Sequence, residues 1–400
     1  MLKRITSKVG ALAMLAVVMP AAVTTAPAAA RQSDPVRQVT AGGYHACEII
    51  GAQAYCWGDN SWGQLGDGTK ANQWTAVPVR APRGVVFTQL TAGFDHTCGI
   101  SGAKAWCWGN SGTSEFPATP VPVPAPRGVV FTQLTAGHDY TCGIGGGRAY
   151  CWGENIWGQL GNGDTTDQRT PVPVRAPQGV RFTQLTAGNH HACGIGGGRA
   201  YCWGNGGGGE LGDGGTANQT AAVPVRAPRG VVFTRLAAGD GYTCGIGGAG
   251  TYCWGNGGHG QLGDGGTANR TTPVPVLAPR GVVFTQLTAG FAHACGISGT
   301  GAYCWGEGAD GKLGNGNTKD QRTPVPVRAP QGIRFTRITA GYSHTCGTSG
   351  VRTWCWGYGN RGELGNASTA TRTTPVEVQF ARHPLNGRIL VDPRTGSASP

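Results

Sequence analysis

One tripeptide, Cys-Trp-Gly, recurs seven times in this chain of 400 residues. Successive copies are 51 residues apart, except for one step of 44 residues between the second and the third. Their cysteines are Cys56, Cys107, Cys151, Cys202, Cys253, Cys304 and Cys355. A second cysteine stands nine residues before each of these, at Cys47, Cys98, Cys142, Cys193, Cys244, Cys295 and Cys346. A period near 50 with several short strands per unit is typical of a β-propeller, and seven units predict seven blades.

Each repeat contains four candidate strands, which we name a to d. In one repeat, strand a is predicted at Val85–Ala92, strand b around the first cysteine, strand c over Ala-Tyr-Cys-Trp-Gly and strand d over Pro-Val-Pro-Val. Glycine at 72 positions and proline at 25 disfavour long helices, whereas 39% hydrophobic residues disfavour disorder. We therefore predict an all-β, seven-bladed propeller of four-stranded antiparallel blades over residues 31–381, with a tail at 382–400.

The prolines of strand d cannot donate to a ladder, which places that strand at a sheet edge. A short Ala-Pro-Arg-Gly turn joins strand d to the next strand a, and short connections usually join neighbours. We therefore expect strand d of one repeat to pair with strand a of the next. Pro375–Val378 would then close the ring against Val36–Thr40. One repeat per blade without such a clasp is the alternative.

The two cysteines of each repeat flank a hairpin. The midpoint between them begins with glycine, for example Gly51-Ala52, as a two-residue type II′ turn requires. Counting outward from that turn places Cys47 opposite Cys56 at a non-hydrogen-bonded pair, where the Cα atoms come within reach of a disulfide. We predict one such bridge in every blade. Free thiols or a metal site are the alternatives, although zinc sites usually have closer cysteines.

The first thirty residues have the layout of a secretory signal peptide. Lys3, Arg4 and Lys8 precede an apolar run, and Ala28-Ala29-Ala30 offers small residues for cleavage near Ala30. The apolar run is shorter than the roughly 20 residues that span a bilayer. We expect a secreted or extracellular protein without a transmembrane segment, in a compartment where disulfides form.

The combined pattern Ala-Gly-x-x-His-x-Cys-Gly-Ile, Tyr-Cys-Trp-Gly-x-Asn-x-x-Gly-Gln-Leu-Gly-Asp-Gly and Thr-Pro-Val resembles the regulator of chromosome condensation repeat family. The resemblance covers nearly all of residues 36–380 and implies a seven-bladed propeller that binds proteins through its faces. One family member acts as a guanine-nucleotide exchange factor and binds chromatin, and a secreted bacterial relative inhibits β-lactamases. The second repeat departs from the pattern because residues 109–118 lack the Gly-x-Leu-Gly element, which predicts a shortened loop in blade 2.

The chain shows little that indicates chemistry. Histidine stands two residues before the first cysteine in five repeats, and Tyr140 or Tyr242 takes that place in the other two. A hydrogen bond within the a–b turn explains this set better than a metal. The histidines are His45, His96, His191, His293 and His344. The Asp-Gly loops lack the spacing of calcium sites, and no nucleophile or phosphate motif occurs. We predict no catalytic residue, metal or cofactor, and Cys-Trp-Gly tryptophans that pack between blades.

Positions at which the repeats disagree are the candidates for binding. They are the two residues after Thr-Ala-Gly and one position after Cys-Trp-Gly, which strand parity places on one face. Exposed, variable aromatic side chains are typical of a protein-binding face. The candidate partner-binding residues are Tyr44, Trp62, Phe94, Asp95, His138, Asp139, Trp157, His190, Asp240, His259, Phe291, Asp310, Tyr342 and Arg361. Drift without a partner would give the same variability.

The opposite face is predicted to be basic, because the d–a loops and b–c turns contain fourteen basic residues and no acidic residue. The b–c turns contribute Lys104, Arg148, Arg199 and Arg352. The d–a loops contribute Arg80, Arg83, Arg127, Arg175, Arg181, Arg226, Arg229, Arg280, Arg328 and Arg334. Such a face should attract a polyanion, a cell-envelope polymer or nucleic acid, and Arg83, Arg127, Arg229 and Arg280 are the candidate anion-binding residues.

The sequence thus predicts a monomeric, exported, non-enzymatic protein-binding module with a variable acidic and aromatic face and a basic face. The partner protein is not identified by these patterns. A nucleotide exchange factor, a chromatin-binding protein or an inhibitor of a secreted enzyme such as a β-lactamase is the alternative that the family resemblance offers.

Overall fold

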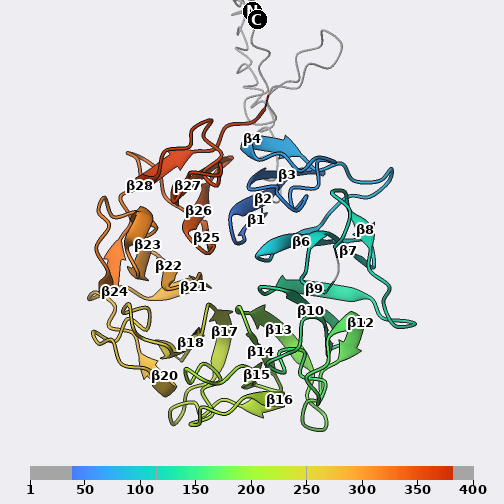
Figure 1. Cartoon of the computed structure of the whole chain (residues 1–400). Coiled ribbons are helices and arrows are strands. Elements are labelled where there is room, and N and C mark those ends of the chain that lie inside the picture. Colours follow the sequence, from blue (N-terminus) through green and yellow to red (C-terminus); the bar gives the residue numbers. More distant parts are fainter. Residues whose placement is uncertain (1–37, 114, 249, 382–400) are drawn as a thin grey trace, which may run out of the picture. The chain divides into compact units, whose positions relative to one another are not determined.

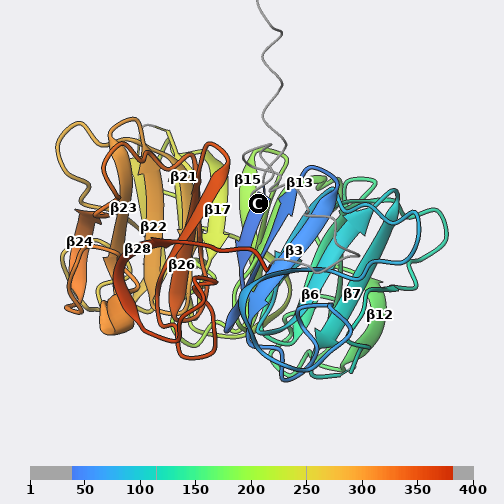
Figure 2. The ribbon, with the colours of Figure 1, turned by 90° about the horizontal axis from the view of Figure 1, so that it is seen from above.

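The computed structural model describes residues 38–113, 115–248 and 250–381, so the signal peptide predicted at 1–30 and the tail predicted at 382–400 lie outside the described residues. Seven four-stranded sheets stand around a central axis (Figure 1). Seen from the side, the strands run from one face of the propeller to the other (Figure 2). The predicted all-β architecture of seven antiparallel blades is confirmed.

The strands of type a are β1 (Gln38–Ala41), β5 (Gln89–Ala92), β9 (Phe131–Ala136), β13 (Phe182–Ala187), β17 (Phe233–Ala238), β21 (Phe284–Ala289) and β25 (Arg337–Ala340). Those of type b are β2 (His45–Ile50), β6 (Asp95–Ser101), β10 (Tyr140–Gly145), β14 (His191–Gly196), β18 (Tyr242–Gly247), β22 (His293–Ser298) and β26 (His344–Ser349).

The strands of type c are β3 (Gln53–Gly58), β7 (Lys104–Asn110), β11 (Arg148–Gly153), β15 (Arg199–Gly204), β19 (Gly250–Gly255), β23 (Gly301–Gly306) and β27 (Arg352–Gly357). Those of type d are β4 (Gln73–Pro78), β8 (Val121–Pro122), β12 (Gln168–Pro173), β16 (Gln219–Pro224), β20 (Arg270–Pro275), β24 (Gln321–Pro326) and β28 (Arg372–Glu377). One short 3-10 helix, η1 (Ala309–Gly311), lies in a c–d loop.

Every blade is one repeat, with its strands in the order a-b-c-d from the axis outward. The expected pairing of strand d with the next strand a is therefore wrong. Strand a contacts the strands a of both neighbouring blades around the axis, whereas strand d is outermost. The d–a connection crosses from the outer edge of one blade to the inner edge of the next, so it cannot act as a hairpin.

Ring closure takes place on the outer edge instead. The chain continues past β28 and runs parallel to β4 of blade 1, where Ala76 faces Phe380. The Ala76 amide donates to Gln379 O at 2.8 Å, and the Ala381 amide donates to Ala76 O at 3.0 Å. The Phe380 side-chain ring packs edge-on against Tyr55 at 5.2 Å. This edge can pair because alanine replaces the first proline of strand d in blade 1.

All fourteen cysteines form the predicted bridges, one in each b–c hairpin, with Cα atoms 4.0 to 4.1 Å apart. The register Cys47↔Cys56 is the predicted one. The turn prediction is only partly right. Gly51 alone has a positive φ of 57° in blade 1, as type II′ requires, but Gly146 and Gly147 both have positive φ values, 59° and 77°, as type I′ requires. The turn of blade 4 also has two glycines with positive φ, as in blade 3, whereas Gly299 of blade 6 has no positive φ.

The Cys-Trp-Gly tryptophans are buried between blades, as predicted. Trp108 of blade 2 donates its indole N–H to Gln64 O of blade 1 at 2.8 Å, and the neighbouring Leu65 is fully buried. In six blades the Gly-x-Leu-Gly loop thus supplies a backbone carbonyl that accepts from the tryptophan of the next blade. Blade 2 lacks this loop, and Trp152 Nε1 of blade 3 has no hydrogen-bond partner among the described residues.

Near the axis, side chains of one strand a satisfy the free edge of the next. Gln38 donates to Leu90 O and accepts from the Leu90 amide, both at 2.8 Å. Thr40 Oγ1 accepts from the Ala92 amide at 3.2 Å. We call the boundary between two blades a seam, and these three bonds its inner bonds. The tryptophan bond to the preceding loop is its outer bond.

Candidate functional site

The antiparallel blades sort the connections onto two faces. The a–b turns and the c–d loops open on one face, which we call the mouth, and the b–c turns and d–a loops lie on the other, which we call the base. The candidate partner-binding residues stand in a–b turns and c–d loops, so they share the mouth, as strand parity predicts.

Side-chain rings of the mouth form one connected arc around the axis. Phe291 lies 4.1 Å from Tyr342 between ring centroids, and Tyr342 lies 5.7 Å from Tyr44. Tyr44 in turn contacts Phe94 at 5.6 Å and Tyr358 at 6.2 Å. These residues come from blades 6, 7, 1 and 2. The arc is therefore a product of the closed ring, because its members are far apart in the chain.

The arc continues through two histidines into blades 3 and 4. His138 stacks on Phe94 with ring centroids 4.1 Å apart, and His190 follows at 5.7 Å. Trp157, 38% exposed, ends the arc at 6.2 Å from His190. Blade 5 interrupts it, because Asp240 and Gly241 stand where the other blades have side-chain rings.

Beside the arc, the inner ends of strands a form an open pocket of about 90 Å³. It is lined mostly by the alanines and glycines before the a–b turns, together with Phe94, Phe291 and Tyr342. The glycines are required there. A Cβ on Gly42 would lie 2.2 Å from Gly93 O, and one on Gly341 would lie 2.4 Å from Gly42 O. The same contact recurs around all seven blades, so the narrow end of the channel is made of backbone.

An ion pair holds the arc at the junction of blades 7 and 1. The Arg361 guanidinium lies 4.5 Å from the centroid of the Tyr44 ring and donates to Asp59 Oδ2 at 3.0 Å. Glu363 accepts from the Arg361 amide at 2.9 Å. Burial raises the pKa of Glu363 to about 7. The nearby mouth therefore has less negative charge at neutral pH than its sequence indicates.

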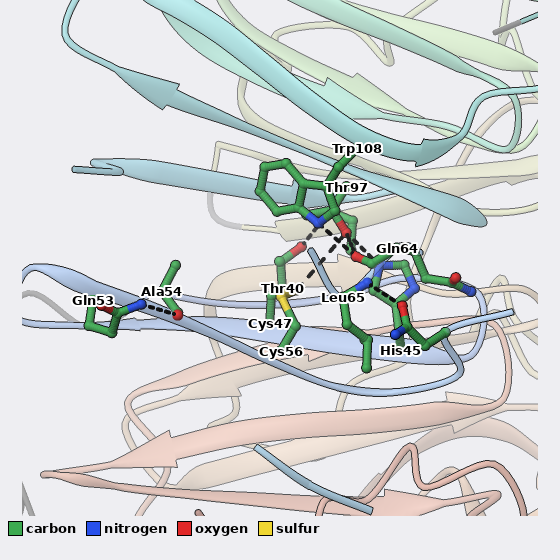
Figure 3. The surroundings of a disulfide bond; sticks show 12 residues. Thr40, His45, Cys47, Gln53, Ala54, Cys56, Gln64, Leu65, Thr97 and Trp108 are labelled. Atoms are coloured by element: carbon green, nitrogen blue, oxygen red, sulfur yellow. Dashed lines mark hydrogen bonds between the residues drawn. A yellow bond between two sulfur atoms is a disulfide. The ribbon is translucent and has the colours of Figure 1, made fainter. Parts of the chain in front are cut away.

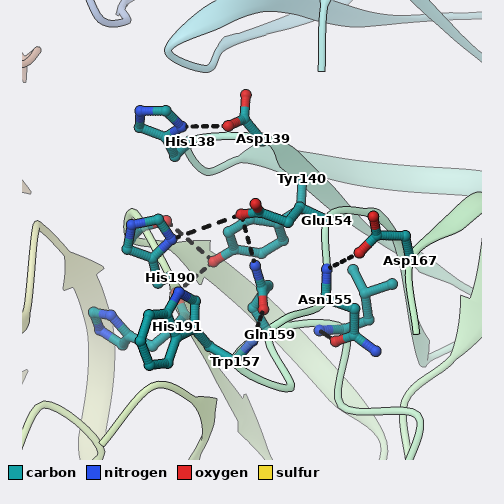
Figure 4. A network of polar contacts seen from close by, with 12 residues as sticks. His138, Asp139, Tyr140, Glu154, Asn155, Trp157, Gln159, Asp167, His190 and His191 are labelled. Carbon is teal, nitrogen blue, oxygen red and sulfur yellow. Dashed lines mark hydrogen bonds and ion pairs between the residues drawn. The ribbon is translucent and has the colours of Figure 1, made fainter. Parts of the chain in front are cut away.

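A second polar network lies under the histidines (Figure 4). His138 Nδ1 is 2.7 Å from Asp139 Oδ2. Burial alone would raise the pKa of Asp139, but the hydrogen bond with His138 and the charges of His138, His96 and His190 together outweigh it, and the pKa is lowered. Gln159 donates to Glu154 Oε2 at 3.2 Å, and His190 Nδ1 lies 3.9 Å from the same oxygen. Figure 4 shows these side chains one beneath the other.

Asp95, in the a–b turn of blade 2, is another carboxyl of the mouth with a raised pKa. Burial, with repulsion from Asp59 and Asp139, raises its pKa to about 6. Burial also raises the pKa of Glu210 to about 7. Small changes of pH near neutrality would therefore change the charge of the mouth.

The structure brings together eight of the fourteen predicted partner-binding residues by direct ring or cation contacts: Tyr44, Phe94, His138, Trp157, His190, Phe291, Tyr342 and Arg361. Asp95, Asp139 and Asp240 stand beside them in the a–b turns. Trp62, His259 and Asp310 lie in c–d loops and no ring contact joins them to the arc within the described ranges. His259 instead lies 3.2 Å from Asp320.

Tyr358 is a member of the arc that the sequence analysis missed. It follows Cys-Trp-Gly directly, where the other repeats have Asp59, Asn110, Glu154, Asn205, Asn256 and Glu307. The sequence signal that could have identified it is an aromatic residue at a position where the other six repeats have an acidic or amide side chain.

The repeated histidines are structural, but their hydrogen bond differs from the predicted one. His45 Nε2 lies 2.8 Å from Thr97 Oγ1 of the next blade (Figure 3), not within its own a–b turn. Where the next blade has alanine in place of threonine, tyrosine replaces histidine, and Tyr140 donates to His191 O at 2.5 Å. His344 breaks this rule because it faces Ala46, and neither of its ring nitrogens has a partner among the described residues.

Four of the arginines assigned to the base lie elsewhere. A Cβ on Gly163 would be 2.4 Å from Arg175 Cζ, so this guanidinium lies against the c–d loop of its own blade. Arg80, Arg226 and Arg328 lie in the same way beside Gly68, Gly214 and Gly316. The candidate anion-binding arginines are exposed on the d–a turns: Arg83, Arg127, Arg229 and Arg280.

The family model of the regulator of chromosome condensation (RCC1) repeat matches residues 52–100, 146–195, 197–246, 250–297 and 301–347. The chain belongs to the RCC1 repeat family. Domains of this type typically mediate protein binding. The ultraviolet-B receptor UVR8 of Arabidopsis thaliana is 30% identical over 351 residues, which cover 86% of this chain and 69% of the receptor. The human E3 ubiquitin-protein ligase HERC2 is 30% identical over 232 residues, but these cover only 5% of the ligase.

Two solved structures support the same fold. Human WBSCR16 superposes with a TM-score of 0.74 at 19% identity, covering 84% of this chain and 95% of that one. Yeast RCC1 (Prp20), solved bound to Kap60, gives a TM-score of 0.72 at 20% identity, covering 81% and 83%. At such identities the likeness concerns the fold alone.

Two further findings concern the setting of this RCC1-type propeller. Its seven disulfides indicate an oxidising environment. Across the part of the chain that the structure describes, no helix has the length and apolarity needed to cross a membrane, and no group of three or more metal-ligating side chains occurs.

Proposed function

We propose that this protein is an exported, non-enzymatic binding module that engages another protein through its mouth. The observation that carries the proposal is the connected arc of side-chain rings from Phe291 to Trp157 around the channel. Aromatic side chains offer large contact areas at low entropic cost and are enriched in the central residues of protein interfaces. The a–b turns that hold most of them are closed by backbone hydrogen bonds, as from the Gly42 amide to His45 O at 2.9 Å, which lowers the conformational entropy lost on binding.

The charges of the mouth support binding rather than catalysis. Asp59 is paired with Arg361, Asp139 with His138, and Glu307 with Lys312 at 2.5 Å. Carboxylates held in this way position the side-chain rings of the arc. The disulfides, together with the basic and apolar N-terminal segment, support export with cleavage near Ala30.

The test is capture of proteins from the native extracellular milieu on the immobilised mature chain. The triple variant F94A/W157A/Y342A should lose the captured partner, with at least a hundredfold loss of affinity, because three side chains spread along the arc are truncated. Trp74, 48% exposed on the outermost strand β4, supplies the matched control. The W74A variant should bind as the unsubstituted chain does. Equal capture by both variants would contradict the proposal.

Inhibition of a secreted enzyme is a second candidate within the same proposal, favoured because an aromatic mouth can cover a protruding active-site rim. Titration of the captured partner's activity with the mature chain distinguishes inhibition from simple binding. A nucleotide exchange factor or a chromatin-binding protein remains the family alternative, and it predicts capture of a nucleotide-binding protein or of nucleosomes instead.

A further inference from the structure

The base is built from six turns of one geometry. In each d–a loop a proline carbonyl accepts an amide three residues on, as when Val85 donates to Pro82 O at 3.0 Å. The glycine between them has a φ of 77° to 82° in all six turns. Glycine at this third position is what a type II turn requires. The residue before the glycine therefore occupies the tip of a rigid turn.

Each of the six turns carries one arginine, although its position differs. Four turns read Arg-Gly-Val-Val, and the arginine stands at the tip: Arg83, Arg127, Arg229 and Arg280. The other two read Gln-Gly-Val-Arg and Gln-Gly-Ile-Arg, so that the tip is neutral and the arginine, Arg181 or Arg334, stands three residues later. The repeats thus differ in which of the two positions holds the arginine, but every turn keeps one positive charge.

Where the tip holds the arginine, the later position holds an exposed valine. Val86, Val130, Val232 and Val283 are 47%, 50%, 54% and 60% exposed. Packing does not require valine there, because Arg181 and Arg334 occupy the same position. The valines also lie on the base itself, since the Val86 amide donates at 3.0 Å to Ser101 Oγ beside a b–c turn. Buried Phe87 follows Val86 and fixes the backbone.

The positive charge of this surface is largely uncompensated. The b–c turns add Lys104, Arg148, Arg199 and Arg352, and neither set of turns contains an acidic residue. Arg352 lies 3.5 Å from Glu377. Within the described ranges, no carboxylate forms an ion pair with Arg83, Arg127, Arg229 or Arg280. The base thus presents cations and exposed valines side by side.

We propose that the base docks onto the surface of an anionic phospholipid bilayer. The tip arginines contact lipid phosphates, for which the guanidinium is suited, and the valines enter the boundary between headgroups and acyl chains. A soluble polyanion would use the arginines and leave the valines without a role. Because the blades share one strand order and stand around one axis (Figure 1), their d–a turns lie on the same face, so several can contact one membrane together. The proposal concerns the base and does not depend on partner binding at the mouth.

Sedimentation of the mature chain with vesicles tests the proposal. The chain should bind vesicles of equal parts phosphatidylglycerol and phosphatidylcholine at least tenfold more tightly than vesicles of phosphatidylcholine alone, with weaker binding at high salt. The variant R83Q/R127Q/R229Q/R280Q should lose this binding. The variant R80Q/R175Q/R226Q/R328Q removes the same charge from arginines whose side chains lie beside the c–d loops, and it should bind within about threefold of the unsubstituted chain.

The valines separate a bilayer from a soluble polyanion. The variant V86S/V130S/V232S/V283S should bind anionic vesicles about tenfold more weakly, since its apolar contact area is lost, and should still be retained by immobilised heparin. Circular dichroism should show all three variants folded. Unaltered vesicle binding by the serine variant would overturn the proposal in favour of a polymer or nucleic acid. Equal loss in the two arginine variants, or no binding by the unsubstituted chain, would overturn it as well.

Discussion

Two of the seven seams lack opposite parts of the same set of hydrogen bonds. The seam between blades 2 and 3 keeps its inner bonds, with Gln89 bonded to the backbone of Leu134 at 2.9 and 3.0 Å and Thr91 to the Ala136 amide at 3.0 Å. Its outer bond is missing, because blade 2 lacks the Gly-x-Leu-Gly loop and Trp152 Nε1 has no described partner.

The seam between blades 5 and 6 is the converse. Its outer bond is present, since Trp305 donates to Gln261 O at 2.9 Å. Arg235 and Ala237 replace the glutamine and the threonine, so no side chain can accept from the Leu287 and Ala289 amides as in the seams between blades 1 and 5. Leu287 is accordingly less buried than its counterparts Leu134, Leu185 and Leu236.

The comparison teaches that a seam tolerates the loss of its outer bond when its inner bonds are complete, and the loss of its inner bonds when its outer bond is present. Each seam also buries a Cys-Trp-Gly tryptophan, and every seam except that between blades 7 and 1 buries a phenylalanine beside it. A single hydrogen bond contributes about 1 kcal/mol. Removing the remaining layer of a weakened seam should therefore cost more than the same change in a complete seam.

The largest expected effect comes from acid, which acts on one of the two seams. His96, whose Nε2 lies 2.9 Å from Thr141 Oγ1, fastens blades 2 and 3, whereas Tyr242 takes this place between blades 5 and 6. Burial lowers the pKa of His96 to about 4. The folded state thus favours the neutral ring, and its stabilising contribution is complete above pH 6.5 and lost as the pH falls toward 4. The loss is about 3 kcal/mol.

Urea unfolding at pH 7.5, 5.5 and 4 measures this loss. The variant H96Q keeps a hydrogen-bonding side chain that does not titrate, so its stability should fall by about 3 kcal/mol less over the same range. Because His45, His191, His293 and His344 also have lowered pKa values, the unsubstituted chain should lose more than His96 alone explains. Identical pH profiles for the two proteins would contradict the assignment.

The double variant Q89A/T91A removes the inner bonds where the outer bond is already missing. We expect a loss of about 3 kcal/mol in the free energy of unfolding, because three hydrogen bonds disappear, and local opening between blades 2 and 3 by hydrogen exchange. Q133A/T135A is the matched control, since that seam keeps the bond from Trp203 to Gln159 O at 3.0 Å. The control should lose less and should open only globally. Equal behaviour of the two variants would mean that the layers do not compensate.

The double variant R235Q/A237T restores the inner bonds between blades 5 and 6. Three new hydrogen bonds should stabilise the protein by about 2 kcal/mol and slow amide exchange at Leu287 and Ala289. R235Q/A237V differs from it by a single hydroxyl, so Ala289 should continue to exchange rapidly in that variant while Leu287 is protected. Unchanged exchange at both amides in R235Q/A237T would show that the seam does not adopt the common geometry.

The smallest effect concerns the closing seam between blades 7 and 1. A46T places a hydroxyl opposite His344, as Thr97, Thr141, Thr243 and Thr345 are placed opposite histidines in other seams. We expect a gain of about 1 kcal/mol at pH 7.5, measured by urea unfolding. A46V has the same shape without the hydroxyl and should bring no such gain. A gain shared by both variants would show that packing, not the hydrogen bond, was improved.

The strands, hairpins and disulfides could be predicted because each depends on residues close together in one repeat. The turn glycine and the nine-residue spacing fixed the pairing of Cys47 with Cys56. Strand parity likewise placed the variable loops on one face. The clasp was predicted wrongly, because a short connection was taken to join neighbouring strands, whereas it spans from outer edge to inner edge. The sequence also shows that the arginine stands either at the tip of the d–a turn or three residues later, in place of the valine.

The sequence by itself determined the blade, since each blade is a meander whose contacts lie within about 40 residues. The tertiary structure alone decided what happens between blades. Gln38 meets Leu90, His45 meets Thr97, and Phe291 approaches Tyr44 through Tyr342 only because seven blades close into one ring. These contacts join residues about 50 or more positions apart. Their partners follow from the order of strands around the axis, which local propensities do not specify.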